Sequence, residues 1–378
     1  MGGDASLLLF LSDMSVFASS SFVPSRQHRL RDLMAKRRLD FLLVSNPKNI
    51  FYLTGFRGST GIAVLGLEQA VLFVDPRYTL QAREQSAGVD VHEVRRPLLS
   101  AAGQWLIRRR TRNVGYDDAH LTCSGFSELQ RRVPKATLRA SGGLVEDLRL
   151  VKDSGEIDCI RQAGQITAAV FSEVRGTLRP GLRESDLAAE IEYRMRLHGA
   201  EGAAFETIVA SGERSAWPHA RASSKLLKED ELVIFDLGAI LQGYAADMTR
   251  TVFLGRPSRR VERLYAAVLM AQEQAIKAVR PATACGKVDF TARRALSGRA
   301  LDRYFTHSTG HGVGLDIHEK PRLARKEETL LEPGCVVSVE PGVYIEGLGG
   351  VRIEDTVLVT EIGAEVLTPL SKDDWIIS

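Results

Sequence analysis

The spacing of apolar and polar residues divides the chain into two parts with different periods. Over residues 26–143, short apolar runs alternate with stretches of helical spacing, and the run Phe41–Val44 is typical of a buried strand. The apolar runs 61–65 and Ala70–Val74 flank a short turn and predict a hairpin. This alternation predicts an α/β domain with a mixed sheet.

A different pattern begins near residue 144, in which helical spacing continues over longer stretches of the chain. Apolar positions keep helical spacing over residues 157–178, until Pro180 and Gly181 end the helix, and Ser185 is expected to cap the next one. Farther along, the period shortens towards two residues, which is typical of strands. The expected strands are residues 232–237, 245–254, 336–345 and 351–359, and the expected helices between them are residues 261–279 and 288–304. Helices gathered around a long antiparallel sheet predict an α+β domain over residues 144–378.

The first 25 residues are expected to be either a leader with little order or an overcalled start, with Met14 as a possible initiator. Residues 7–11 are an apolar run, but no lysine or arginine precedes Arg26, and Asp4 and Asp13 flank the run. This composition is unlike a signal peptide, and the run is far shorter than the roughly 20 residues that span a bilayer. We therefore expect a protein without a membrane anchor, located in the cytoplasm.

The composition and the charge balance narrow the functional classes. The 378 residues are 44% hydrophobic and 26% charged, which are ordinary values for a globular protein. The net charge of +3 combines +7 over residues 1–150 (21 basic against 14 acidic) with −4 over residues 151–378 (29 against 33). The basic surplus is scattered and lacks interleaved aromatic residues, so a nucleic-acid partner is not expected. The four cysteines have no spacing typical of a zinc site or a disulfide framework, which agrees with a reducing compartment.

Five polar residues interrupt the apolar strands of the second part. A buried carboxylate is unfavourable unless a cation or hydrogen-bond donors compensate for it, so five such positions call for a common explanation. They are Asp236 in VIFDLGA, Asp247 in GYAADMTRT, His311 in HSTGHGVGLDIHE, Glu340 in VVSVEPGVY and Glu354 in GGVRIEDTVLV. An oxygen-rich set with one histidine suits Mn²⁺, Co²⁺, Fe²⁺ or Zn²⁺, and the four carboxylates could hold two ions.

Each of the five residues also has a local structural explanation when it is taken alone. Asp236 precedes Leu-Gly and could cap a turn, Asp247 could pair with Arg250, and Glu354 could pair with Arg352. All five together, inside apolar runs and beside glycine-rich turns, favour the metal site.

The ordered set of five and its neighbours resemble the pita-bread metallopeptidases of the Xaa-Pro aminopeptidase and prolidase group. The matching motifs are GHGVGLDIHEKP, EPGVY and GGVRIEDT, which surround the proposed ligands. LVSNPKNIFYLTGFRGSTG and LVEDLRLVKDSGEI are similar to the creatinase-like N-terminal domain of this group and to the linker that follows it. The resemblance implies a pita-bread catalytic domain over residues 144–378, preceded by a creatinase-like α/β domain over residues 26–143.

The resemblance also implies a ligand set and a reaction. Asp236 would bind one metal ion, His311 and Glu340 would bind the other, and Asp247 and Glu354 would bridge both. The ions are expected to be Mn²⁺, with Co²⁺ or Zn²⁺ as alternatives, and a hydroxide that bridges them would attack the scissile carbonyl. Glu340 would carry the proton from that water to the departing proline nitrogen.

Further residues match active-site positions of the group. His219 and His318 would donate hydrogen bonds to the scissile carbonyl oxygen or the tetrahedral intermediate, and His307 would line the substrate pocket. Arg352 would orient a ligand carboxylate, and Tyr344 matches another active-site position. Taken alone, these side chains would more often serve packing or local polar contacts.

The resemblance implies a peptidase that acts on substrates with proline in the second position. Arg322 matches the position where prolidase-like members hold the C-terminal carboxylate of a dipeptide, so we favour dipeptides slightly over the longer peptides of an Xaa-Pro aminopeptidase. A solvated loop arginine is the alternative interpretation of Arg322. A creatinase-like amidinohydrolase or an inactive binding module on the same fold would lack ligands that this chain keeps. The group's N-terminal domain often mediates dimerisation, so we expect a homodimer.

Overall fold

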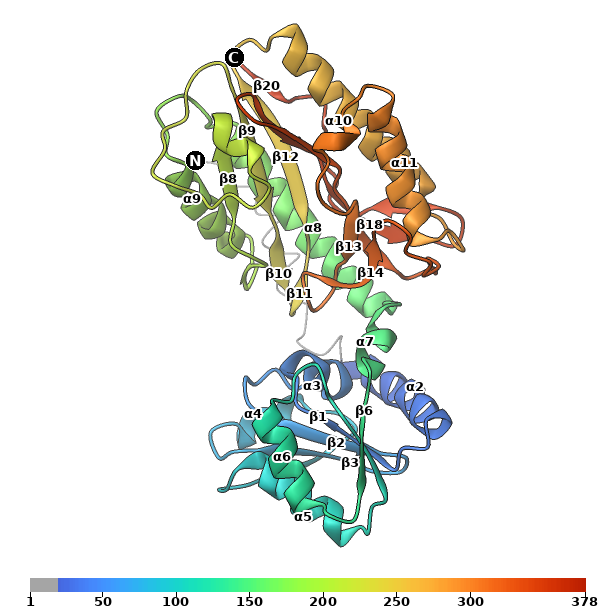
Figure 1. Ribbon diagram of the computed structural model, residues 1–378. Helices are drawn as coiled ribbons and strands as arrows, with labels where there is room; N and C mark the ends of the chain where they lie inside the picture. The colour runs from blue at the N-terminus through green and yellow to red at the C-terminus, as the bar shows by residue number, and fades with distance from the viewer. Residues whose placement is uncertain (1–19) are drawn as a thin grey trace. The chain divides into compact units, whose positions relative to one another are not determined.

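The computed structural model describes residues 20–378, which divide into two compact units (Figure 1). The first unit ends at Arg149 and the second runs from Leu150 to Ser378. The division falls after α7 (Leu144–Arg149), whereas the sequence pattern places it before these residues. Residues 1–19 of the expected leader lie outside the described residues, and the described chain begins with the short 3-10 helix η1 (Ser20–Phe22). No helix among residues 20–378 is long and apolar enough to cross a bilayer.

The first unit is built on a mixed sheet, as its alternating pattern predicts. Its further elements are α2 (Val23–Lys36), β1 (Phe41–Val44), α3 (Pro47–Thr54), β2 (Ile62–Gly66), β3 (Ala70–Val74), α4 (Thr79–Gln85), β4 (Asp90–Glu93), α5 (Leu98–Arg108), β5 (Asn113–Tyr116), α6 (Cys123–Arg132) and β6 (Thr137–Ala140). Within residues 20–149, six strands lie in the order β4-β3-β2-β1-β5-β6. The pairs β1-β2 and β2-β3 are antiparallel and the others are parallel. The predicted hairpin is confirmed, because Leu65 pairs with Ala70 at its turn.

Burial of the central strands explains the continuous apolar runs of this unit. All four residues of β1 are buried, as expected for a strand that is covered on both faces. The indole of Trp105 on α5 packs edge-on against the rings of Phe41 and Phe73, with ring centroids 5.2 and 6.3 Å away. These aromatic contacts anchor α5 to the sheet.

The second unit, all of whose residues are described, contains two pairs of long helices. The helices are α8 (Ser154–Arg175), α9 (Glu184–Leu197), α10 (Arg259–Ala278) and α11 (Cys285–Ser297), with the 3-10 helices η2 (Gly212–Ala216) and η3 (Asp302–Tyr304). A capping box of Asp153 and Glu156 starts α8. The prediction that Ser185 caps α9 is wrong, because Arg183 occupies that N-cap position. Ser185 lies in the first turn, where its hydroxyl bonds the carboxylate of Asp186.

The single long antiparallel sheet expected from the strand pattern is wrong. The strands are β7 (Gly202–Ala203), β8 (Ile208–Ser211), β9 (Glu231–Leu237), β10 (Ala239–Leu241), β11 (Tyr244–Ala245), β12 (Met248–Leu254), β13 (Gly310–Gly312), β14 (Glu319–Leu323), β15 (Val336–Val339), β16 (Gly342–Ile345), β17 (Gly349–Arg352), β18 (Asp355–Val359), β19 (Ala364–Val366) and β20 (Ile376–Ile377). Within the second unit they form separate sheets, ordered β20-β12-β9-β8, β14-β13-β15-β18-β19, β11-β10-β7 and β16-β17.

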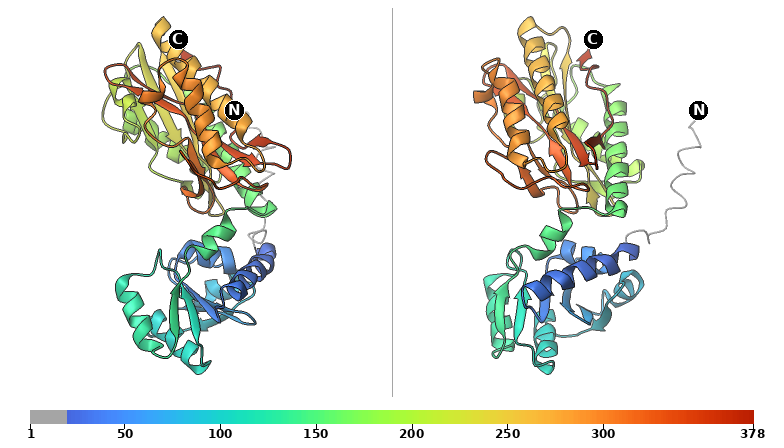
Figure 2. Two further views of the ribbon diagram at one scale, coloured as in Figure 1. Left: turned by 45° about the vertical axis from the view of Figure 1, so that its right-hand side comes forward. Right: turned by 90° about the vertical axis from the view of Figure 1, so that its right-hand side faces the viewer.

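Each helix pair of the second unit has its own hydrophobic core with part of these sheets. Residues of α8 and α9 pack with β8, β9 and β12, whereas residues of α10 and α11 pack with β15 and β18. Figure 2 shows α8 on one outer side of the strands and α10 and α11 on the other. This layered α+β arrangement is the pita-bread architecture that the resemblance implies.

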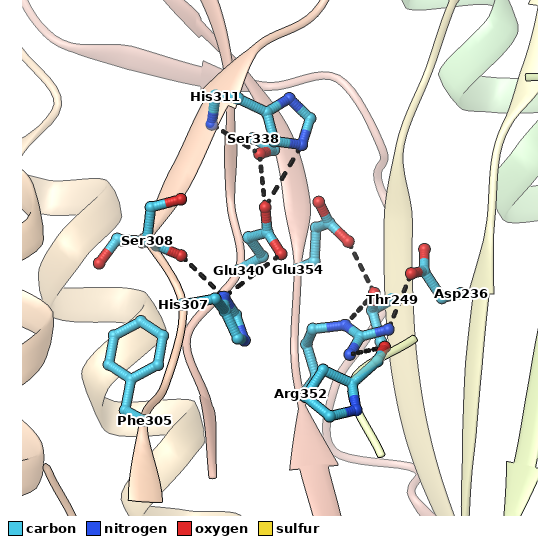
Figure 3. Close-up of polar contacts among 12 residues, drawn as sticks. Asp236, Thr249, Phe305, His307, Ser308, His311, Ser338, Glu340, Arg352 and Glu354 are labelled. Carbon is cyan, nitrogen blue, oxygen red and sulfur yellow. Dashed lines mark hydrogen bonds and ion pairs between the residues drawn. The ribbon is translucent and has the colours of Figure 1, made fainter. Parts of the chain in front are cut away.

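Two expected strands of this unit are each broken in the middle. Residues 336–345 separate into β15 and β16 at Glu340 and Pro341, and residues 351–359 separate into β17 and β18 at Ile353 and Glu354. Proline has no N–H to donate to a strand ladder, which favours a break there. Because β15 pairs with β18 and β16 pairs with β17, the two breaks lie opposite each other. They place Glu340 and Glu354 side by side (Figure 3).

Candidate metal centre

The five polar residues that interrupt the strands come together in the second unit. They are Asp236 in β9, Asp247 just before β12, His311 in β13, Glu340 just after β15 and Glu354 just before β18. One ligand atom from each of Asp247, His311 and Glu354 lies within 4.8 Å of the other two. Figure 3 shows that Asp236, His311, Glu340 and Glu354 approach one another from neighbouring strands. This group is called the five-residue cluster below.

His311 presents one ring nitrogen to the acidic residues of the cluster. Its Nδ1 lies 3.0 Å from the carbonyl oxygen of Gly312, an acceptor that places the ring proton on Nδ1. Its Nε2 lies 3.3 Å from Glu340 Oε1 and 3.6 Å from Asp247 Oδ2. Burial opposes the charged form of His311, but its contact with Glu340 raises the pKa of the ring. Once the ring is neutral, the lone pair of Nε2 points towards the carboxylates, as a metal ligand requires.

Two carboxylates of the cluster each have one oxygen held and one oxygen free. Asp236 Oδ2 accepts a bond of 2.8 Å from Arg352, and Glu354 Oε2 accepts a bond of 2.6 Å from the hydroxyl of Thr249. Within residues 20–378, the other oxygens, Asp236 Oδ1 and Glu354 Oε1, are buried without a hydrogen-bond partner. Because buried polar atoms are normally paired, these oxygens fit ligands of a divalent cation.

The electrostatics of the cluster also favour a cation. Burial raises the pKa of Asp247 and of Glu354 well above its usual value, and repulsion from neighbouring carboxylates acts in the same direction. Burial likewise raises the pKa of Asp236, although the charge of Arg352 opposes this. Burial opposes the charged form of Glu340 too, but its bond from His311 and nearby positive charges hold the pKa of this carboxyl below its usual range. Divalent ions would relieve the repulsion that the metal-free cluster carries.

The local ion pairs considered as structural explanations do not form within the described chain. Arg250 pairs with Asp355 at 2.8 Å instead of with Asp247. Arg352 pairs with Asp236 at 2.8 Å instead of with Glu354. Local pairing therefore leaves the burial of Asp247 and Glu354 unexplained.

His307 lies beside Glu340 and is held by two polar contacts. Its Nε2 is 2.9 Å from the hydroxyl of Tyr344, and its Nδ1 is 2.8 Å from the carbonyl oxygen of Ser308 and 3.9 Å from Glu340 Oε2. Burial lowers the pKa of His307, which keeps its ring neutral at neutral pH.

The other two candidate histidines are exposed. The ring of His318 meets that of His311 edge-on, with centroids 4.2 Å apart, so it borders the cluster. Burial of part of the ring lowers the pKa of His318, and the charges of His311 and His219 add to this effect. His219 follows η2 in the chain. The exposed ring of His318, next to the buried cluster, could reach a substrate from the solvent side.

Arg352 is buried and makes contacts on several sides. Its guanidinium donates to Asp236, to the Tyr344 hydroxyl at 2.8 Å and to Thr249 Oγ1 at 3.1 Å. It also donates to the carbonyl oxygen of Pro218, directly before His219. Arg352 thereby ties a cluster carboxylate to the segment that carries His219.

Comparison with known proteins identifies the family. Residues 158–361 match the family described as Metallopeptidase family M24, and residues 26–151 match the Creatinase/Prolidase N-terminal domain. The chain belongs to metallopeptidase family M24. The divalent metal ions that M24 enzymes use agree with the donor set of the five-residue cluster.

Relatives of this M24 chain match over nearly its whole length. The Xaa-Pro dipeptidase of Pyrococcus furiosus is 35% identical over 349 residues, which are 92% of this chain and 99% of that protein. The structure of an Xaa-Pro dipeptidase from Bacillus anthracis has a TM-score of 0.91 at 36% identity, covering 94% and 100% of the two chains. The structure of an X-Pro aminopeptidase from Thermotoga maritima has a TM-score of 0.86 at 34% identity, covering 92% and 100%.

Arg322 lies in β14, directly opposite His311 in the antiparallel pair with β13. Residues directly opposite each other project from the same face of a sheet, so the exposed side chain of Arg322 stands on the face that carries His311. A register shift follows between His311 and Gly312. Arg322 is therefore an exposed residue of a strand and does not lie in a loop.

Sequence reasoning missed two hydroxyl residues of the M24 site. Thr249 bonds Glu354, and Ser338 donates to Glu340 Oε1 at 3.2 Å while it accepts from the backbone N–H of His311 at 3.1 Å. A signal was present for Ser338, because a strand residue two positions before Glu340 faces the same side. Serine and threonine are common in strands, so neither residue stood out.

Proposed function

We propose that this M24 chain hydrolyses the bond between an N-terminal residue and proline, with a slight preference for dipeptides. The observation that carries the proposal is the five-residue cluster, in which buried carboxylate oxygens of Asp236 and Glu354 lack partners within residues 20–378. The Xaa-Pro dipeptidases among the relatives support the choice of substrate.

We propose that the cluster holds two divalent ions, with Mn²⁺ as the first candidate and Co²⁺ or Zn²⁺ as alternatives. The carboxylates and the single imidazole would be the ligands, as the motifs imply. Bound ions would supply Lewis acidity, which makes water acidic and polarises the scissile carbonyl. Four carboxylates around one histidine are a donor set that suits Mn²⁺.

Side chains of the protein would carry out proton transfer, stabilise the carbonyl oxygen and bind the proline. The lowered pKa of Glu340 shows that its carboxylate is charged, and this form would accept a proton and pass it to the departing nitrogen. The exposed ring of His318 beside His311 can donate a hydrogen bond where negative charge develops on the carbonyl oxygen, and His219 is the second candidate donor. Neutral His307 and the Tyr344 hydroxyl, 2.9 Å apart, would line the pocket for the proline side.

The choice between dipeptides and longer peptides rests on Arg322. A guanidinium on the His311 face could bind the C-terminal carboxylate of a dipeptide, which lies close to the scissile bond. Cleavage of longer peptides is the second candidate function, supported by the likeness to an X-Pro aminopeptidase of Thermotoga maritima.

A substrate panel tests the proposal. Metal-free enzyme would be assayed with Ala-Pro, Ala-Pro-Ala and Ala-Ala, each with added Mn²⁺, Co²⁺ or Zn²⁺. We expect metal-dependent release of alanine from Ala-Pro, slower cleavage of Ala-Pro-Ala and no cleavage of Ala-Ala, because proline supplies a tertiary amide that has no N–H. Absence of cleavage of both proline peptides with every metal would refute the proposal, and faster cleavage of Ala-Pro-Ala would favour the aminopeptidase.

Replacement of Arg322 separates the two substrate classes. Arg322→Ala should raise the KM for Ala-Pro about tenfold or more through loss of a charge-assisted hydrogen bond, with little change for Ala-Pro-Ala. Arg325→Ala, at an exposed position three residues away, is the matched control and should leave both unchanged. An equal change for both peptides would contradict the assigned role.

A homodimer and a cytoplasmic location stay predictions from the sequence. Gel filtration of the full chain tests the first, and a mass of one chain would contradict it.

A further inference from the structure

A network of charged and polar side chains around Asp355 adjoins the five-residue cluster. Asp355, which follows Glu354 in the chain, is fully buried and accepts four hydrogen bonds. The donors are Lys372 Nζ at 2.6 Å, Arg250 Nη2 and Gln272 Nε2 at 2.8 Å each, and Thr368 Oγ1 at 3.1 Å. Because all of these charges must be desolvated, a buried carboxylate with two cations contributes less to stability than its four hydrogen bonds suggest.

Arg250 connects this network to the cluster. Its Nη1 donates to the backbone carbonyl oxygens of Thr249 and Glu354, while its Nη2 holds Asp355 Oδ1. Thr249 in turn donates its hydroxyl to the Glu354 carboxylate and accepts the backbone N–H of Glu354 at 3.1 Å with its carbonyl oxygen. The guanidinium of Arg250 thus fixes the backbone on both sides of one proposed metal ligand.

The C-terminal segment also contacts Arg250 and α10. Arg250 also donates to the carbonyl oxygen of Leu370 at 2.9 Å. The hydroxyl of Tyr265 on α10 donates to the carbonyl oxygen of Lys372 at 2.6 Å, and its ring stacks on Trp375 with centroids 4.1 Å apart and planes 8° apart. β20 then pairs with β12, the strand that carries Thr249 and Arg250 (Figure 1). These contacts hold the C-terminal segment against α10 and β12.

We propose that Lys372 is a positioning residue for the metal centre, acting through Asp355 and Arg250. Lys372 and Gln272 occupy Asp355 Oδ2, which leaves only Oδ1 for Arg250. Without the ammonium group, the guanidinium could turn to bind both oxygens of Asp355 side by side and would release the carbonyl oxygen of Glu354. The C-terminal segment would thus control how Glu354 presents its carboxylate. This inference rests on the proposed metal centre.

Cobalt binding to the full-length chain tests the inference without relying on activity. Metal-free wild-type protein and the variants Lys372→Met and Lys372→Arg would be titrated with Co²⁺ alone, and the visible absorption of the bound ion followed. We expect Lys372→Met to weaken binding about tenfold or more and to change the shape of the spectrum, because outer partners orient metal ligands. Lys372→Arg should bind as the wild type does, since a cavity of about 70 Å³ beside Arg250, Tyr265 and Trp375 has room for the larger side chain.

The matched control is Lys277→Met, which makes the same change at an exposed lysine of α10 and should leave cobalt binding unchanged. If Lys372→Met does not fold, Tyr265→Phe replaces it, because that variant loses only the hydroxyl that holds the Lys372 carbonyl oxygen and should weaken binding in the same direction. Unchanged affinity and spectrum in the folded variant, with normal binding by the wild type, would overturn this inference alone. Failure of the wild type to bind Co²⁺ would overturn the metal centre and the inference together.

Discussion

At the scale of one residue, the charge of Asp247 favours cation binding but destabilises the metal-free fold. Its carboxylate is buried, and repulsion from Glu354, Asp236 and Glu340 adds to the effect of burial in raising its pKa. The charged form that a cation needs is therefore the form that the metal-free fold disfavours. A residue selected only for stability would be neutral at this position.

Asp247→Asn should separate these two effects. The amide keeps the size of the side chain and removes its charge, so the free energy of unfolding of the metal-free chain should rise by about 1 kcal/mol. The same variant should lose more than about 100-fold in affinity for Mn²⁺, measured by calorimetric titration. A less stable metal-free variant, or one that keeps the affinity of the wild type, would contradict the assignment.

The stabilisation by Asp247→Asn should also depend on pH. Between the ordinary pKa of 3.8 and the raised pKa of Asp247 in the folded chain, the folded state binds more protons than the unfolded state, so the wild type loses stability as pH rises. The asparagine variant has no such titration at this position. Urea unfolding of both metal-free proteins at several pH values should show a difference that grows from near zero at acid pH. A constant difference would show that Asp247 is not held at a raised pKa.

Residue patterns were sufficient to find the five-residue cluster but not the residues that hydrogen-bond to it. Each of the five stood out because it is polar within an apolar run, and the motifs around them fixed the family. Thr249 and Ser338 have hydroxyls that occur in strands of every kind, so only their contacts reveal them. The pairing of Arg352 with Asp236 across 116 positions of sequence could not be read from local spacing either.

At the scale of the element, close packing of β13 positions His311. A methyl group added at Gly310 would lie 1.9 Å from the carbonyl oxygen of Ser338, and one added at Gly312 would lie 2.1 Å from that of Lys320. Both clashes are with backbone atoms of the neighbouring segments, which cannot move aside alone. The glycines on both sides of His311 therefore allow the strand to approach its neighbours closely enough to bring the imidazole into the cluster.

Gly310→Ala should push β13 away from β15 and displace His311. We expect a loss of about 3 kcal/mol in the free energy of unfolding and a weaker affinity for Mn²⁺, measured by urea unfolding and calorimetry. Gly363→Ala is the matched control, because nothing lies within 4 Å of an added methyl group there, and it should change stability by less than about 0.5 kcal/mol. Equal effects of the two substitutions would contradict the close approach.

Most elements followed from periodicity, whereas their ends and breaks did not. The predicted strand of residues 232–237 differs from β9 by one residue, because the apolar run of a buried strand extends over nearly its whole length. The breaks at Glu340 and Glu354 were not expected, because strand-like spacing continues on both sides of each polar residue. The cap of α9 was assigned to Ser185 from residue preference, but that helix starts earlier at Glu184, whose buried carboxylate accepts from Ser211 and Ser223. A tertiary contact overrode the local preference.

At the scale of the whole molecule, the sequence predicted an α/β part followed by an α+β part, and the structure has both. The sequence pattern did not predict that the strands of the second unit would form separate sheets. The pairing of strands far apart in the chain depends on how α8 to α11 pack, which local spacing does not show. The buried acids of the cluster have neighbours of like charge, and they would be balanced by bound cations.

The central claim is that the five-residue cluster holds two divalent ions and cleaves before proline. Its most direct test is the release of proline from Ala-Pro by the metal-free wild type as Mn²⁺ is added stepwise. The account predicts no release above the blank without metal, and a rate that rises to a plateau at two ions per chain. Release that persists in the presence of a chelator, or no release with Mn²⁺, Co²⁺ or Zn²⁺, would contradict it.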